Sequence, residues 1–255
     1  MKTMFLTLLT AVFLVHCGGG AEEATPAPTP EPSPKSAPSA PSTGDSASLS
    51  GTAIFSGDVP AREDIQMASD PSCARMHTET VQTEFAVVAD NGGLKNVFVY
   101  VKEGLEGQSF DVPSEAALLD QEGCLYKPRV FGVRAGQTLT ISNSDETLHN
   151  IHAMPAANKE FNIGQPIKGL KTDKVFETPE VMVPFKCDVH KWMAAYVGVV
   201  DHPFFATTDS NGGFTIPDLP AGDYVIEAWH EKFGTQQANV TVGADGATAD
   251  FTFSE

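Results

Sequence analysis

Nine consecutive residues, 185–193, bring three soft metal donors into one short segment of the chain. They read Phe-Lys-Cys-Asp-Val-His-Lys-Trp-Met, so Cys187, His190 and Met193 follow one another at Cys-x2-His-x2-Met spacing. A thiolate and two imidazoles, with a weak axial thioether, are the donor set of an electron-transfer copper site. Strand-like runs at 181–187 and 194–200 flank the segment. A metal loop needs rigid elements around it, so this feature predicts a β-sheet scaffold.

The second imidazole has to come from elsewhere in the chain, and His149 is the candidate. It follows the strand-like run 138–142 after a polar extension and is itself followed by Asn150. His152 is the alternative ligand, but it precedes Ala-Met-Pro, which is typical of a rim. Zinc fits the set poorly, because structural zinc sites use four Cys or His ligands and no Met.

Short strand-like runs separated by turn residues extend along most of the chain, and long helical periodicity is absent, which predicts an all-β fold. One unit contains the runs 129–133, 138–142, 172–177, 181–187 and 194–200. Residues 83–88 and 97–102 are expected to form a hairpin around the turn residues 90–93. A single helical turn is expected at 115–119.

The N-terminal part of the chain reads as a targeting segment and a spacer. Residues 1–17 have a positive start and an apolar run too short to span a bilayer, which indicates an export signal. The signal resembles that of a bacterial lipoprotein, with Leu14 and Gly18 at the expected positions and His16 departing from the pattern. Lipidation of Cys17 is therefore expected, with plain cleavage nearby as the alternative. Residues 18–48, rich in Pro, Ala and Ser, are expected to be a semi-rigid linker.

Cysteine use and charge narrow the location and the partners. Of four cysteines, Cys17 is assigned to the anchor and Cys187 to the metal, which leaves Cys73 and Cys124 to pair in an oxidising compartment. A lipid-anchored protein of the bacterial cell envelope, facing the periplasm or the cell surface, is expected. The formal charge of −17 argues against nucleic acid and favours a redox partner with a basic face.

Residues 128–200 resemble the cupredoxins of the plastocyanin and amicyanin type. The resemblance is carried by Gly136-Gln137, Asn143-Ser144-Asp145, His149-Asn150 and the Cys187, His190, Met193 loop, whose short His-to-Met gap matches amicyanin. Val183 stands where a dinuclear copper centre would need a second Cys.

This resemblance implies a Greek-key β-sandwich and one copper ion cycling between Cu(I) and Cu(II). The implied ligands are His149, Cys187, His190 and Met193. Asn150 is implied to tie the first-ligand loop to the Cys loop, and the ring edge of His190 to reach the surface as the electron port.

Residues 201–255 resemble a small transthyretin-like β-sandwich, the carboxypeptidase regulatory-like domain. The resemblance is carried by the turn motifs at 208–214 and 219–224, which indicate fold and carry no peptidase chemistry. Residues 49–56 resemble the first strand of the same module. The copper domain, expected over residues 49–200, would then be inserted between strands of that module.

The expected function is that of a non-enzymatic, mononuclear copper protein that carries single electrons at the cell envelope. A periplasmic copper carrier or buffer is the first alternative, although the seven methionines are scattered along the chain. An enzyme with an open copper position and a structural surface module also remain open. His77, His202 and His230 are expected in loops or packed at strand ends, with Cys73-x3-His77 as a minor candidate for a second metal.

Overall fold

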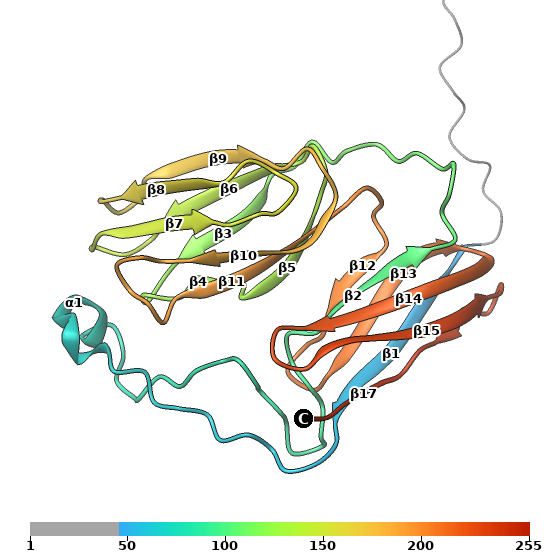
Figure 1. Ribbon diagram of the computed structural model, residues 1–255, viewed down its shortest axis with the longest axis horizontal. Helices are drawn as coiled ribbons and strands as arrows, with labels where there is room; N and C mark the ends of the chain where they lie inside the picture. The colour runs from blue at the N-terminus through green and yellow to red at the C-terminus, as the bar shows by residue number, and fades with distance from the viewer. Residues whose placement is uncertain (1–45) are drawn as a thin grey trace, which may run out of the picture. The chain divides into compact units, whose positions relative to one another are not determined.

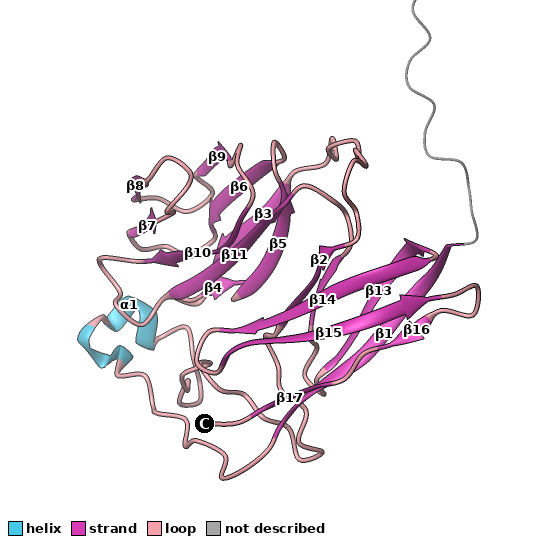
Figure 2. Cartoon of the chain, turned by 45° about the vertical axis from the view of Figure 1, so that its right-hand side comes forward, coloured by secondary structure: helices cyan, strands magenta, loops and turns pink. Residues whose placement is uncertain are grey.

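The computed structural model describes residues 46–255. The predicted signal, the lipidation of Cys17 and residues 18–45 of the predicted linker lie outside the described residues. Among the described residues, no helix combines the length and hydrophobicity needed to cross a bilayer. The described chain is all-β, as the sequence predicts, and two short helical turns are its only helices (Figure 2).

The first sandwich carries the predicted metal ligands and consists of two sheets (Figure 1). One sheet has the order β5-β11-β10-β7-β8 and the other the order β4-β3-β6-β9. Parallel pairs join β5 to β11 and β3 to β6, and the other pairs are antiparallel. The strands are β3 (Ala117–Gln121), β4 (Tyr126–Lys127), β5 (Val130–Arg134), β6 (Thr138–Asn143), β7 (His149–Ala153), β8 (Phe161–Gln165), β9 (Lys171–Val175), β10 (Glu180–Lys186) and β11 (Ala194–Val200).

Alternation along these strands builds the core of the first sandwich. In β6, Leu139 and Ile141 are fully buried while Thr138 and Thr140 remain partly exposed, the period-two pattern of a strand with one face toward the core. Phe185 at the end of β10 packs against Phe176 and Phe161 in the same core. The core reaches the end of β10, so it supports the loop that follows.

The second sandwich is built from chain segments that precede the first sandwich in the sequence and from segments that follow it. One sheet has the order β13-β1-β16 with β17 also paired to β1, and the other has the order β12-β2-β14-β15. The strands are β1 (Ser46–Phe55), β2 (Phe98–Glu103), β12 (Phe205–Thr207), β13 (Gly213–Pro220), β14 (Gly222–His230), β15 (Gly234–Val242), β16 (Ala247–Thr248) and β17 (Phe251–Phe253). The predicted copper domain, 49–200, therefore contains two strands, β1 and β2, that pair within the second sandwich.

Three local expectations are wrong. Strand β1 begins at Ser46, inside the predicted linker. The predicted hairpin is reduced to its turn: Val88 bridges Leu94 around residues 90–93, while β2 pairs with β12 and β14 instead of residues 83–88. Residues 117–121 form β3 rather than a helical turn, and parallel pairing to β6 determines their conformation.

Two glycines allow side chains of the second sandwich to pack on the first. Gly132 of β5 and Gly198 of β11 are register partners on neighbouring strands. A Cβ atom at Gly198 would lie 2.5 Å from the ring of Phe98, and one at Gly132 would lie 2.4 Å from the ring of Phe205. Arg129 and Glu231 add an ion pair across the same contact, with Nε 2.6 Å from Oε1.

We expect Gly198→Val to lower the free energy of unfolding by about 1–3 kcal/mol, because the new side chain overlaps the Phe98 ring. The matched control is Gly164→Val in β8, where an added Cβ meets no atom within 4 Å. Urea unfolding midpoints measure both. An equal loss in the two variants would show that the contact with Phe98 is not the cause.

Because His230 is buried, we expect the protein to lose stability as the pH falls. Its ring is 1% exposed and stacks on Phe233 with centroids 4.7 Å apart. Burial, with the nearby charges of Arg129 and Lys232, lowers the pKa of His230 to about 4 from 6.5. The unfolded chain binds the proton first as pH falls, so stability is lost between these two values, by about 3 kcal/mol at most.

The measurement compares urea midpoints of the metal-free protein at about pH 7 and about pH 4. In His230→Gln, the drop between the two pH values should be smaller than in the native chain. An identical drop would assign the acid sensitivity to other groups.

Candidate metal centre

Three side chains from two parts of the first sandwich converge on one buried point. His149 begins β7, Cys187 directly follows β10, and His190 lies in the loop between β10 and β11. One donor atom from each lies within 4.8 Å of the others, and all three residues are buried. His149 Nδ1 is 3.0 Å from His190 Nδ1.

Met193 closes the ligand loop. The Cys187 N–H donates to the Met193 carbonyl at 3.2 Å, and the Met193 N–H donates to the His190 carbonyl at 2.9 Å. Met193 is 1% exposed and packs in the core of the first sandwich. The loop therefore turns back on itself and places Met193 in the same buried region as the other predicted ligands.

Asn150 makes the link that the cupredoxin resemblance implies. Its Oδ1 accepts hydrogen bonds from the backbone N–H groups of Asp188 at 2.7 Å and Val189 at 3.2 Å. The same oxygen lies 3.2 Å from Cys187 Sγ, which also accepts the His190 N–H at 3.2 Å. Asn150 thus joins β7 to the ligand loop and fixes the position of the sulfur.

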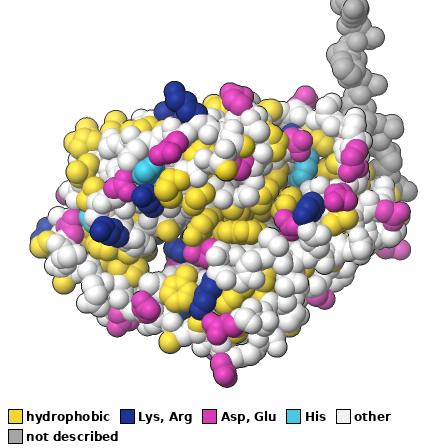
Figure 3. Space-filling view, in the orientation of Figure 1, with side chains coloured by type: hydrophobic (Ala, Val, Ile, Leu, Met, Phe, Trp, Pro, Cys, Tyr) yellow, Lys and Arg dark blue, Asp and Glu magenta, His cyan; other side chains and the backbone are white. Residues whose placement is uncertain are grey.

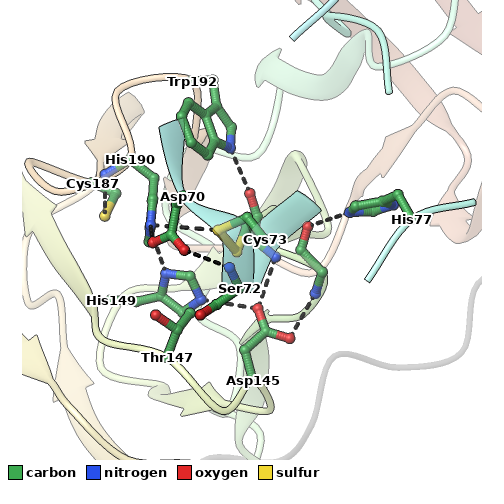
Figure 4. The surroundings of a disulfide bond; sticks show 12 residues. Asp70, Ser72, Cys73, His77, Asp145, Thr147, His149, Cys187, His190 and Trp192 are labelled. Atoms are coloured by element: carbon green, nitrogen blue, oxygen red, sulfur yellow. Dashed lines mark hydrogen bonds and ion pairs between the residues drawn. A yellow bond between two sulfur atoms is a disulfide. The ribbon is translucent and has the colours of Figure 1, made fainter. Parts of the chain in front are cut away.

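A carboxylate holds the outer nitrogen of each imidazole. Asp145 Oδ2 is 2.9 Å from His149 Nε2, and Asp70 Oδ2 is 2.9 Å from His190 Nε2 (Figure 4). An ionised carboxylate only accepts, so each Nε2 carries the proton and each Nδ1 presents a lone pair inward. Two lone pairs 3.0 Å apart beside a thiol repel one another unless a cation or proton lies between them. The donor set therefore fits a metal ion.

The pKa shifts agree with a site built for positive charge. Burial acts to raise the pKa of Cys187, yet the adjacent imidazoles of His149 and His190, which can take up a proton, lower it to about 5 from 9.0 and favour the thiolate. Burial acts to lower the pKa values of His149 and His190. Hydrogen bonds to Asp145 and Cys187 raise that of His149, and hydrogen bonds to Cys187 and Asp70 raise that of His190.

The expectation that the ring edge of His190 reaches the surface is wrong. His190 is 2% exposed. Asp70 and Cys73 contact its Nε2, with Cys73 Sγ at 3.4 Å, and the Trp192 ring lies beside it with centroids 5.1 Å apart. Residues 67–77, which lie outside the strands of the first sandwich, cover the edge that the resemblance left open.

The other histidines among residues 46–255 lie apart from the three converging side chains. His152 lies at the rim, where Nδ1 is 3.1 Å from Asp188 Oδ2 and Nε2 is 2.7 Å from Glu160 Oε1. His77 donates to the Gly123 carbonyl at 2.7 Å. Cys73 and Cys124 form the predicted disulfide, so Cys73 has no free thiolate for a second metal with His77.

Sequence reasoning missed Asp70 and the role of Asp145. Asp145 lies four residues before His149, a spacing that suggests contact, but the motif Asn143-Ser144-Asp145 by itself gives Asp145 no role. Asp70 precedes Pro71 and caps the short helix α1 (Pro71–Ala74) by accepting the Ser72 N–H at 2.8 Å. Asp70 lies 120 residues from His190 in the sequence, and no local pattern predicts a contact between them.

Comparisons with known proteins give one family match and several structural likenesses. Residues 194–254 match the model of the carboxypeptidase regulatory-like domain, less than half of the chain. No curated protein matches the sequence. The matched range begins in β11 of the first sandwich and lacks β1 and β2, which complete the second.

Three similar solved structures are a purple cupredoxin, an amicyanin variant and a copper-containing nitrite reductase. A purple cupredoxin from Nitrosopumilus maritimus is 24% identical over 32% of this chain and 98% of its own, with a TM-score of 0.29. An amicyanin variant in its Cu(I) form is 19% identical over 40% and 97%, with a TM-score of 0.30. A copper-containing nitrite reductase from Thermus scotoductus is 16% identical over 37% of this chain, with a TM-score of 0.32. The match spans about a quarter, 26%, of that reductase chain. The chain therefore combines a β-sandwich that carries a Cys, His, His and Met donor set with a second β-sandwich, and residues 194–254 resemble the carboxypeptidase regulatory-like domain.

Proposed function

We propose that the first sandwich binds one copper ion through His149, Cys187, His190 and Met193 and carries single electrons. The observation that carries the proposal is the buried meeting of Cys187 Sγ with two Nδ1 atoms 3.0 Å apart. When bound there, copper would supply the one-electron couple between Cu(I) and Cu(II).

The residues of the site are arranged to keep one geometry during electron transfer. Asn150 fixes the sulfur through the backbone of the ligand loop, and Asp145 and Asp70 fix the two imidazole rings. Side chains that are already held by such partners need to move little when the charge of the site changes. A small rearrangement is what fast electron transfer requires.

Burial favours a carrier over an enzyme. Each of the four proposed ligands is at most 2% exposed. A catalytic metal keeps one position open to substrate, and these side chains leave no exposed approach within the described residues. Electrons, unlike substrates, pass through a few ångströms of packed protein.

The setting proposed for the protein is the bacterial cell envelope, with Cys17 as a lipid anchor and a periplasmic or surface-facing copper domain. The Cys73–Cys124 disulfide supports an oxidising compartment. The charge of −17 supports a redox partner with a basic face. Figure 3 shows Asp and Glu side chains spread over the visible face rather than gathered in one patch, so we propose no single docking patch.

The test is a visible spectrum of the purified protein after one equivalent of Cu(II), and again after ascorbate. An intense thiolate-to-copper band that bleaches with ascorbate and returns on reoxidation supports the electron carrier. Tight binding of copper with only a weak, pale band would support the alternative of a copper carrier or buffer. No binding would overturn both.

A further inference from the structure

The disulfide of this chain lies against the candidate metal centre. We name residues 67–77, which include the 3-10 turn η1 (Met67–Ser69) and α1, the cap. Cys73 of the cap bonds to Cys124, in the turn between β3 and β4, and Cys73 Sγ is 3.4 Å from His190 Nε2. Figure 4 shows the cap side chains Asp70 and Cys73 directed toward His190.

Each half of the disulfide is adjacent to one of the two carboxylates. Asp70 lies three residues before Cys73 and is oriented by its bond from the Ser72 N–H. Asp145 accepts the Cys124 N–H at 2.7 Å and the Gly123 N–H at 2.8 Å. The same turn receives the Trp192 indole, which donates to the Cys124 carbonyl at 2.9 Å.

The cap has further contacts with the first sandwich. His77 donates to the Gly123 carbonyl, again beside Cys124, and Met67, Cys73 and Ala74 pack in the core of the first sandwich. The cap is thus attached through polar or covalent contacts at two places, the turn 123–124 and the outer nitrogen of His190. Breaking the disulfide removes the covalent attachment at the turn.

We propose that the cap is a wall of the metal centre, in which Asp70 is a positioning residue for His190 and the disulfide keeps Asp70 in place. Asp70 holds the proton of His190 on Nε2 and turns Nδ1 toward Cys187. A carboxylate on the outer nitrogen makes an imidazole a stronger donor and favours the more positive state of a bound metal. The disulfide also closes the outer edge of His190 to solvent.

This inference deepens the proposed function, but its first test needs no metal. The metal-free protein is treated with diethyl pyrocarbonate, and modification of each histidine is followed by mass spectrometry. His190 should be protected in the native chain. In the double variant Cys73→Ser, Cys124→Ser it should react faster by about tenfold or more, because local opening of the cap becomes easier.

Asp70→Ala keeps the disulfide and should give an intermediate rate, and Glu79→Gln, at an exposed position beyond the cap, should leave the native rate unchanged. If the double variant does not fold, as judged by circular dichroism, Asp70→Ala decides alone. A His190 that reacts freely in the native chain, or that stays protected in every folded variant, would overturn the proposal.

The second test measures the reduction potential of the copper-loaded protein. Asp70→Asn removes the charge while its amide oxygen can still accept from Nε2, so the potential should rise. Glu79→Gln removes the same charge from an exposed position and should move the potential less. Equal shifts in the two variants would refute the positioning role of Asp70. If the native protein forms no intense copper band, the proposed function fails, but the protection of His190 in the metal-free protein still tests the proposal about the cap.

Discussion

Cys187→Ser is expected to abolish the intense visible band of the copper-loaded protein. The hydroxyl of Ser does not form the thiolate bond that produces this absorption. Copper affinity should fall by more than the ~10–100-fold that loss of a ligand's hydrogen-bonding partner costs. A visible spectrum and a competition titration with a chelator measure the two effects.

The fold should survive this substitution, because Ser matches Cys in shape and Asn150 Oδ1 lies 3.2 Å from the side-chain position. The unfolding free energy of the metal-free protein should change by about 1 kcal/mol or less. Circular dichroism and urea unfolding provide the control. An intense band that persists in the folded variant would refute Cys187 as the metal ligand.

The second large effect separates His149 from His152. His149 is fully buried, its Nδ1 faces His190, and Asn150 beside it fixes the ligand loop. His149→Ala should therefore convert or destroy the intense chromophore. His152→Ala is the matched control, because it removes an imidazole three residues away whose partners are Asp188 and Glu160 at the rim.

In His152→Ala the spectrum should remain nearly intact, with at most a change in potential or in the rate with a partner. Spectra of both variants at equal copper occupancy make the comparison. The opposite pattern would show that His152 is the first ligand, while leaving the proposal of a copper site in the first sandwich in place.

Local patterns predicted most of the first sandwich and the ligand loop. Cys187, His190 and Met193 lie within seven residues, so a tight loop was enough to group them. Leu139 and Ile141 alternate with threonines, which is the signature of a strand with one buried face. The Cys73–Cys124 pair followed from counting the cysteines of a chain that the sequence predicts to be exported.

Sequence patterns did not predict the contacts between segments that lie far apart in the chain. Asp70 meets His190 although 120 residues separate them, and the Cys73–Cys124 disulfide joins the cap to the first sandwich beside this contact. The resemblance placed His190 at the surface, since it covers residues 128–200 and does not include the cap. Strand β2 reads as half of a local hairpin, and its true partners lie in β12 and β14, about a hundred residues away.

Because the strands of the two sandwiches are interleaved in the sequence, the second sandwich cannot finish folding until the C-terminal strands have been synthesised. Strand β1 pairs with β13 and β17, and Ala53 lies opposite Phe251. Among the described strands, β1 is synthesised first and must wait for β17, which is synthesised last; contacts between such distant segments slow folding. Between β2 and β12 the first sandwich can form on its own strands. Its folding draws the ends of a long loop together and lowers the entropic cost of closing the sheet around β1.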